Sequence, residues 1–172
     1  KKENGATQIR TEHAYDVENR ITSQKWELSD HTAYSESYGY NTSNGTLTSL
    51  STNKGTIRFA YDALLRLSMR TTGQYKETYT YKDKDATNTS GQVEQIVYTG
   101  VTSYFTNTTL GYTYDALGNI KTITRDGVTT EYSYDNQGQL TKEETRNAGN
   151  AITSTYTYTY DTYGNIREKK VY

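Results

Sequence analysis

The sequence has no proline and no cysteine, and it holds only 2 Phe, 1 Trp and 1 Met in 172 residues. Without cysteine the chain forms no disulfides, which leaves the redox compartment open. No apolar run approaches the roughly 18 residues of a membrane-spanning helix. The net charge is −1, from 19 basic and 20 acidic residues, and no basic patch stands out. Nucleic-acid binding therefore has no electrostatic basis here.

Tyrosine takes the place of the missing apolar residues. There are 19 Tyr, while hydrophobic residues make up only 32% of the chain. Tyrosine must therefore supply most of the buried apolar area, and each buried hydroxyl then needs a hydrogen-bond partner. Such polarity is also compatible with disorder. Regular strand alternation and turn residues favour a folded sheet instead.

A short motif, Tyr-Asp-x-x-Gly-x-(Ile/Leu), repeats along the chain. Near-consensus copies contain Tyr114, Asp115 and Gly118; Tyr134, Asp135 and Gly138; and Tyr160, Asp161 and Gly164. Earlier copies contain Tyr15 and Asp16, and Tyr61 and Asp62. The aspartate fits the first position of a type I turn, and the glycine fits a following left-handed residue with a bulge. Each copy is therefore predicted to be a hairpin.

Two copies lack the glycine. Asn19 replaces it in the first, and asparagine tolerates the left-handed region. Leu65 replaces it in another, where we expect a strained or different turn. Two more copies are degenerate, since Tyr38–Leu47 has one extra residue and Lys82–Ser90 is a polar insertion.

The apolar residue after each turn should begin a returning strand. These residues are Ile21, Leu47, Leu67, Val93, Ile120, Leu140 and Ile166, spaced 20 to 27 residues apart. The spacing predicts an all-β chain, with a long antiparallel meander of about 14 strands in one curved or spiralling sheet. Residues 1–172 are expected to form a single repeat domain. Asp126-Gly127 gives the strongest two-residue hairpin prediction, whereas Thr99–Thr109 is ambiguous between strand and loop.

The motif resembles the YD repeat, also called the RHS repeat, of bacterial RHS and wall-associated proteins, toxin-complex B and C components, and teneurins. The resemblance extends from about Tyr15 to Tyr172. It implies a β-ribbon that spirals into a hollow shell, which encloses a toxin polypeptide in the toxin members and serves adhesion in teneurins. The partners it implies are neighbouring repeats and an enclosed toxin domain, in a secreted or cell-surface protein. The family's Asp-Pro self-cleaving segment is absent, because the chain has no proline.

Both ends of the sequence suggest a piece of a longer chain. It begins with Lys1-Lys2, shows no signal peptide, and ends at Val171-Tyr172 within a strand-like segment. Terminal strands without neighbours expose unpaired backbone groups. We therefore expect edge-to-edge self-association, especially through Ile166–Tyr172.

The acidic and histidine residues give little support to catalysis or metal binding. The five motif aspartates share one turn position, so turn capping explains them all and the chain is not expected to be an enzyme. His13 and His31 do not make a zinc set. Asp83, Asp85 and Asn88 only faintly suggest a calcium loop, and a solvated loop is favoured. No cofactor and no metal are therefore predicted.

The tyrosine rows have two interpretations. In the first, they stack across strands and line a structural shell, which makes the chain a non-catalytic repeat segment. In the second, exposed rings bind glycans or proteins. The candidates for sugar stacking are Tyr112, Tyr132, Tyr156 and Tyr158. Sugar platforms require rings open to water, whereas structural rows should be mostly occluded.

Overall fold

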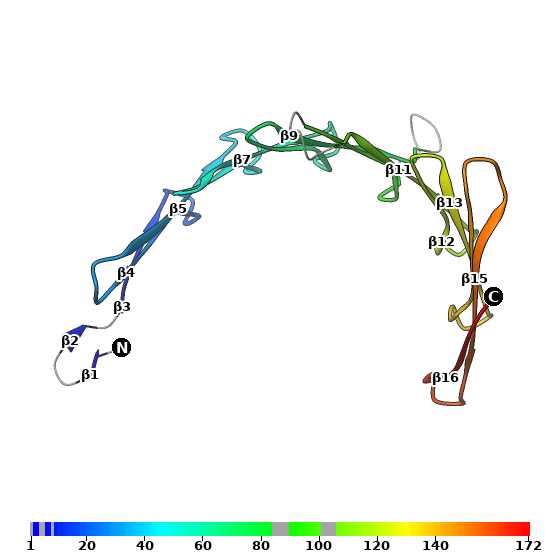
Figure 1. Cartoon of the computed structure of the whole chain (residues 1–172). Helices are drawn as coiled ribbons and strands as arrows, with labels where there is room; N and C mark the ends of the chain where they lie inside the picture. Colours follow the sequence, from blue (N-terminus) through cyan, green and yellow to red (C-terminus); the bar gives the residue numbers. More distant parts are fainter. Residues whose placement is uncertain (1, 4–5, 8, 84–89, 101–105) are drawn as a thin grey trace. The chain divides into compact units, whose positions relative to one another are not determined.

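A computed structural model describes residues 2–3, 6–7, 9–83, 90–100 and 106–172, and all regular structure in these ranges is β-strand (Figure 1). Fourteen strands follow one another in an antiparallel meander, so each is hydrogen-bonded to its neighbours in sequence. They are β3 (Ile9–Tyr15), β4 (Ile21–Leu28), β5 (Ala33–Tyr40), β6 (Leu47–Thr52), β7 (Gly55–Tyr61), β8 (Leu67–Thr72), β9 (Tyr75–Tyr81), β10 (Val93–Thr99), β11 (Thr108–Tyr114), β12 (Ile120–Arg125), β13 (Val128–Tyr134), β14 (Leu140–Arg146), β15 (Ile152–Tyr160) and β16 (Ile166–Val171). The sheet is not closed, because β3 and β16 are its edges. The predicted all-β meander is confirmed.

Two very short strands precede this sheet. β1 (Lys2–Glu3) and β2 (Ala6–Thr7) pair with each other in a separate two-stranded sheet, which the sequence did not predict. The chain divides into two compact units, Lys1–Glu77 and Thr78–Tyr172, each built from antiparallel strands. The single domain over residues 1–172 stays a prediction.

The returning strands begin where the motif predicts. Each of the seven apolar residues that follow a turn is the first residue of its strand. The type of turn is confirmed as well. Gly118 has φ 89° and donates its backbone N–H to the Asp115 carbonyl at 3.2 Å, and the pairing shifts register between Thr113 and Tyr114. This geometry is a type I turn that ends in a left-handed residue and a bulge.

Other connections also follow local residue chemistry. Asp126 and Gly127 both have positive φ, at 50° and 87°, as a type I′ hairpin requires. The insertion after Lys82 is closed at its base, where the Lys82 N–H donates to the Gln92 carbonyl at 2.9 Å. Residues 84–89 of this insertion and residues 101–105 of the ambiguous segment lie outside the described residues.

The sheet has no packed hydrophobic core within the described ranges. No hydrophobic side chain there is fully buried, and Glu144, at 8% exposure, is the buried polar residue. Lys142 donates to Glu144 Oε2 at 2.6 Å and Arg146 binds the other carboxylate oxygen, so the buried charge is compensated. Lys142 contributes most to the lowered pKa of Glu144. Stability must therefore come mainly from contacts within the sheet.

Threonine hydroxyls illustrate such contacts in the second unit. Facing pairs on neighbouring strands lie within hydrogen-bond distance, namely Thr113 and Thr122 at 2.7 Å, Thr124 and Thr129 at 3.0 Å, and Thr130 and Thr145 at 3.0 Å. Pairs of this kind add modest stability at each strand junction.

The turn that contains Leu65 keeps the common geometry. Leu65 has φ 60°, and its N–H still donates to the Asp62 carbonyl at 3.0 Å. The turn therefore has the same geometry as the other copies. The expected strain lies in the backbone of Leu65, which is in the left-handed region.

Replacing Leu65 with glycine should stabilise the chain by roughly 0.5–1 kcal/mol, because it removes the left-handed penalty at the cost of some unfolded-state entropy. Chemical denaturation measures the change. Asn19→Gly is the matched control, because asparagine already tolerates φ 60°; we expect it to be nearly neutral. A destabilised Leu65→Gly variant would show that the leucine side chain makes a compensating contact.

Candidate functional site

The motif aspartates organise the turns through their side chains. One carboxylate oxygen accepts hydrogen bonds from the backbone N–H groups two and four residues later. These donors are Glu18 and Arg20 for Asp16, Leu64 and Arg66 for Asp62, Leu117 and Asn119 for Asp115, Gln137 and Gln139 for Asp135, and Tyr163 and Asn165 for Asp161, all at 2.8–2.9 Å. Each aspartate N–H also donates to the carbonyl four residues on, at 2.9–3.0 Å. The structure thus places these five carboxylates in turn-capping positions.

The residue four positions after the aspartate has a role that the sequence reasoning missed. Arg20 Nε donates to Asp16 Oδ2 at 2.7 Å, and Arg66 Nε donates to Asp62 Oδ2 at 2.6 Å. In the second unit the donor is an amide instead: Asn119 Nδ2 lies 3.0 Å from Asp115 Oδ2, and Asn165 Nδ2 lies 3.0 Å from Asp161 Oδ2. The shared preference for Arg or Asn at this motif position was the available signal.

These hydrogen bonds shift the acidity of the aspartates. The backbone N–H of Arg20 lowers the pKa of Asp16, and the Asn119 and Asn165 amides lower the pKa values of Asp115 and Asp161. At Asp62, desolvation opposes the change, but the hydrogen bonds from Arg66 still lower the pKa. Such carboxylates are poorly suited to proton transfer near neutral pH.

The motif tyrosines join each hairpin to the one before it. Their hydroxyls donate to the backbone carbonyl of the apolar residue that begins the preceding returning strand. The pairs are Tyr40 with Ile21 at 2.9 Å, Tyr61 with Leu47 at 2.9 Å, Tyr114 with Val93 at 2.7 Å, Tyr134 with Ile120 at 2.8 Å, and Tyr160 with Leu140 at 2.7 Å. The same two motif positions are therefore linked across successive repeats. Tyr15 lies on edge strand β3 and is 58% exposed.

Successive turns also touch along their shared edge. A Cβ atom built on Gly164 would lie 3.1 Å from Gln139 Nε2 of the preceding turn, and one on Gly118 would lie 3.5 Å from Gln92 Nε2. Gly164 has φ 84°, a left-handed conformation that glycine adopts without strain, and the Gln139 amide lies close to it. The turn edge is a repeating structural site.

The proposed sugar-stacking tyrosines lie on one face of the second unit. Tyr112, Tyr132, Tyr156 and Tyr158 are all half-buried, so they are neither fully open nor enclosed. Burial is the main cause of the raised pKa of Tyr112 and of Tyr132. Their assignment as glycan platforms stays a prediction.

Two of these rings are already engaged by a cation. Lys169 Nζ lies 4.5 Å from the centroid of Tyr156 and 5.2 Å from that of Tyr158. The Tyr158 hydroxyl also donates to Glu143 Oε1 at 2.6 Å. A ligand that stacks on these two rings would have to displace Lys169.

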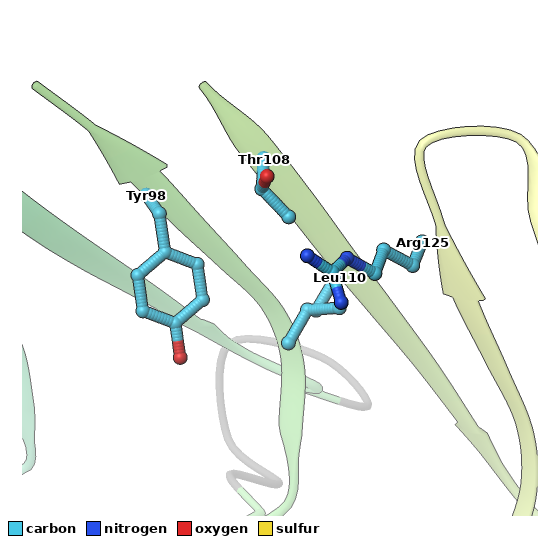
Figure 2. Close-up of a pocket in the computed structure, with 4 residues that line it drawn as sticks. All are labelled: Tyr98, Thr108, Leu110 and Arg125. Carbon is cyan, nitrogen blue, oxygen red and sulfur yellow. The ribbon is translucent and has the colours of Figure 1, made fainter. Parts of the chain in front are cut away.

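A hollow on the same face was not predicted from the sequence. Tyr98 of β10, Thr108 and Leu110 of β11, and Arg125 of β12 line a space of about 310 Å³ (Figure 2). Leu110 and Arg125 also line a neighbouring depression that reaches Tyr132. One ring, one threonine hydroxyl, one aliphatic side chain and one exposed cation form a small mixed surface, and none of these four lining residues is a carboxylate or a histidine.

Metal and membrane sites find no support in the described residues. No group of three or more His, Asp or Glu side chains is placed there to hold a metal ion. His13 and His31 lie apart on β3 and on the turn after β4. Of the faint calcium loop, Asp85 and Asn88 lie outside the described residues. No helix in the described ranges is long and apolar enough to cross a membrane.

Comparison with known proteins agrees with the repeat. The model of the family described as RHS Repeat matches residues 114–151, which contain the turns of Asp115 and Asp135. Residues 114–151 are thus similar to an RHS repeat. No curated protein matches it.

Two solved structures share the fold of this chain. A structure of the Photorhabdus luminescens Tc holotoxin pore matches with a TM-score of 0.63 and 16% identity. The crystal structure of TcdB2-TccC3-TEV matches with a TM-score of 0.61 and 16% identity. Each match covers 95% of this chain and 10% of the other chain. The chain thus spans about a tenth of the solved chains that it matches.

Removing one motif hydroxyl should weaken the junction between two repeats. We expect Tyr134→Phe to lower the free energy of unfolding by about 1 kcal/mol, because the Ile120 carbonyl loses its donor while the ring remains. Tyr163→Phe is the control, since Tyr163 is 90% exposed at a turn tip. Urea unfolding of both variants makes the comparison, and equal effects would contradict the role of the hydroxyl.

The turn aspartates should make stability fall in acid. Because hydrogen bonds lower the folded pKa values of Asp16, Asp62, Asp115 and Asp161, their contribution is complete above the ordinary aspartate pKa and disappears as the pH falls below it. The thermal unfolding midpoint should therefore decrease below about pH 4.

A pair of variants at Asp115 separates charge from capping. Asp115→Asn keeps the Oδ1 acceptor, as Asn147 does naturally for the N–H groups of Gly149 and Ala151 at 3.0 Å. It should be tolerated and show a weaker acid dependence. Asp115→Ala loses both caps and should lower the midpoint by several degrees at neutral pH. Equal midpoints for Ala and Asn would reject capping.

Proposed function

We propose that this chain is a non-catalytic structural segment of an RHS-type protein, and that its sheet forms part of the wall of a shell around a toxin polypeptide. We further propose that the parent protein is secreted or displayed at the cell surface. The observation that carries the proposal is the linkage of each hairpin to the preceding one by a tyrosine hydroxyl. Such linkage can continue through any number of repeats.

The construction of the sheet supports a wall. Its described residues bury no hydrophobic core, yet Tyr114, Tyr134 and Tyr160 of the second unit are half-buried and their hydroxyls donate to backbone carbonyls of the sheet. Such a sheet holds its register without a second layer packed against it. A wall requires this property, because both of its faces meet something other than its own core.

The comparisons support the proposed setting. The chain matches about a tenth of chains found in a Tc holotoxin pore and in TcdB2-TccC3-TEV. A segment that aligns over 95% of its own length with so small a part of larger chains is expected to act as part of a larger assembly. Neighbouring repeats and an enclosed toxin are the partners that we propose.

The non-catalytic part of the proposal rests on the occupied aspartates. Their carboxylate oxygens cap turns, and hydrogen bonds lower four of their pKa values. Neither property suits a general acid or base at neutral pH.

Small-angle scattering tests the wall against a compact module. Extrapolated to infinite dilution, an open sheet should give a radius of gyration well above the value of about 16 Å for a compact domain of this length. A value near 16 Å would mean that the chain closes on itself, and it would overturn the proposal of an open wall segment.

Glycan or protein binding is the second candidate, and the hollow beside Tyr98 and Arg125 favours it. Saturation-transfer NMR with soluble wall glycan fragments distinguishes the two functions. Saturation transfer from the protein to the glycan that Tyr132→Ala abolishes and Tyr163→Ala preserves would support binding at this face. If the wild-type chain transfers no saturation to the glycan, glycan binding is rejected and only the structural function remains.

A further inference from the structure

Three interior strands of the second unit form an apolar depression with a cation beside it. Leu110 of β11 faces Arg125 of β12, and Arg125 faces Val128 of β13. The Arg125 side chain extends from β12 toward Leu110 (Figure 2). The hollow of about 310 Å³ adjoins a depression of about 460 Å³, and the two share Leu110 and Arg125. Because β11, β12 and β13 are each hydrogen-bonded on both sides, this surface does not depend on either end of the chain.

The larger depression has an apolar floor. Leu110 and Ile123 are half-buried, Val128 is 41% exposed, and the half-buried Tyr132 ring lines the same space. Apolar area that is left open to water in this way gains free energy when another apolar side chain covers it.

The Arg125 guanidinium has no strong partner within the sheet. Its side chain is 70% exposed, and Nε lies 3.9 Å from Asp126 Oδ2, at the limit of an ion pair. Asp126 is engaged by the turn, since its Oδ1 accepts the Thr109 N–H at 3.0 Å. To the described residues the guanidinium makes no hydrogen bond. It is therefore able to bind an incoming carboxylate through two parallel N–H groups.

Other polar groups of the depression are already engaged. The Thr130 hydroxyl lies 3.0 Å from the Thr145 hydroxyl, and Asp126 caps its own turn. A sugar ring needs several convergent polar groups to fix its hydroxyls. Here the strongest unengaged group is one guanidinium next to apolar surface. That combination fits a ligand with one carboxylate and one apolar group.

An extended polypeptide presents these two groups at a suitable spacing. Side chains at positions i and i+2 of an extended chain lie on the same side, roughly 7 Å apart. A carboxylate on the outer end of Arg125 therefore leaves the second side chain above the floor at Leu110 and Ile123. Such a peptide does not add a strand here, because the backbone groups of interior strands are already paired. Side chains alone make the contact, so we expect weak binding.

We propose that the depression beside Arg125 binds an extended polypeptide segment in which an Asp or Glu lies two residues from a large apolar residue. The Arg125 guanidinium holds the carboxylate, and Leu110, Ile123 and Val128 receive the apolar side chain. The inference rests on the proposed wall function for the source of this segment, which is the enclosed polypeptide. The binding itself is a property of the present chain.

Chemical-shift titration of the isotope-labelled 172-residue chain with short capped peptides tests the proposal. The probe is acetyl-Gly-Leu-Thr-Asp-Gly-amide, which has no terminal carboxylate. It should shift the amide signals of Leu110, Arg125 and Val128 together, with a dissociation constant on the order of 1 mM. Peptides with Asn in place of Asp, or with Ser in place of Leu, should bind about threefold or more weakly, because each lacks one of the two contacts.

Protein variants locate the carboxylate contact. Arg125→Gln should reduce binding of the Asp peptide to the level of the Asn peptide, and it should leave binding of the Asn peptide unchanged. Arg58→Gln is the matched control, because Arg58 is an exposed arginine on the interior strand β7 of the first unit. It should change neither affinity. Val128→Ser should weaken binding of the Leu-containing peptide and provides a second test of the site, and circular dichroism checks that each variant retains its strands.

Several results would overturn the proposal. These are equal binding of the Asp and Asn peptides, no shift at the highest soluble peptide concentration, and shifts caused by wall glycan fragments alone. If only a peptide with a free C-terminal carboxylate bound, an internal segment would be rejected as the ligand. The wall is tested separately by scattering: a large radius of gyration without peptide binding rejects this inference and keeps the wall, and a compact chain that binds the peptide does the reverse.

Discussion

The hydrogen bond from a motif tyrosine to the carbonyl of the preceding repeat is the interaction on which this structure depends. A sheet whose described residues bury no hydrophobic core has little to hold its register, since no second layer selects which face points inward. Five hydroxyl-to-carbonyl bonds, at 2.7–2.9 Å, supply that selection at junctions between repeats. They also explain why tyrosine and not phenylalanine dominates the aromatic residues. The ring covers apolar surface and the hydroxyl fixes the neighbour.

The aspartate turns make the tyrosine link repeatable. Each capped turn places its tyrosine and its returning apolar residue at the same relative position, so the next tyrosine always finds a carbonyl. Sequence variation between the copies is limited to changes that leave the hydrogen bonds of the turn in place. Asn41 accepts the N–H groups of Ser43 and Asn44 in the copy with one extra residue, and the insertion after Lys82 is closed by the same backbone bond to Gln92. Constant links with variable loops are what a long repetitive wall requires.

Local chemistry made much of this fold predictable from the sequence. Strand alternation, the aspartate position and the left-handed glycine are properties of a few adjacent residues, so the returning strands were predicted to the residue and the turn type was correct. The hydrogen-bond partners of the side chains were harder to predict from the sequence. The acceptor of Tyr160 is the carbonyl of Leu140, 20 residues away, and it follows only once the register between repeats is known. The donor role of Asn119 was overlooked because that motif position was treated as variable. Lys169 over Tyr156 likewise depends on which residues face each other across β15 and β16.

Replacing all five linking tyrosines, Tyr40, Tyr61, Tyr114, Tyr134 and Tyr160, with phenylalanine tests the central claim most directly. The sites are distinct, so their effects should add to a loss of about 5 kcal/mol in the free energy of unfolding, comparable with the whole stability of a small domain. The account predicts that urea denaturation of this variant finds little or no folded population at 25 °C. A variant that unfolds at the same urea concentration as the wild type would show that the hydroxyls do not hold the repeats together.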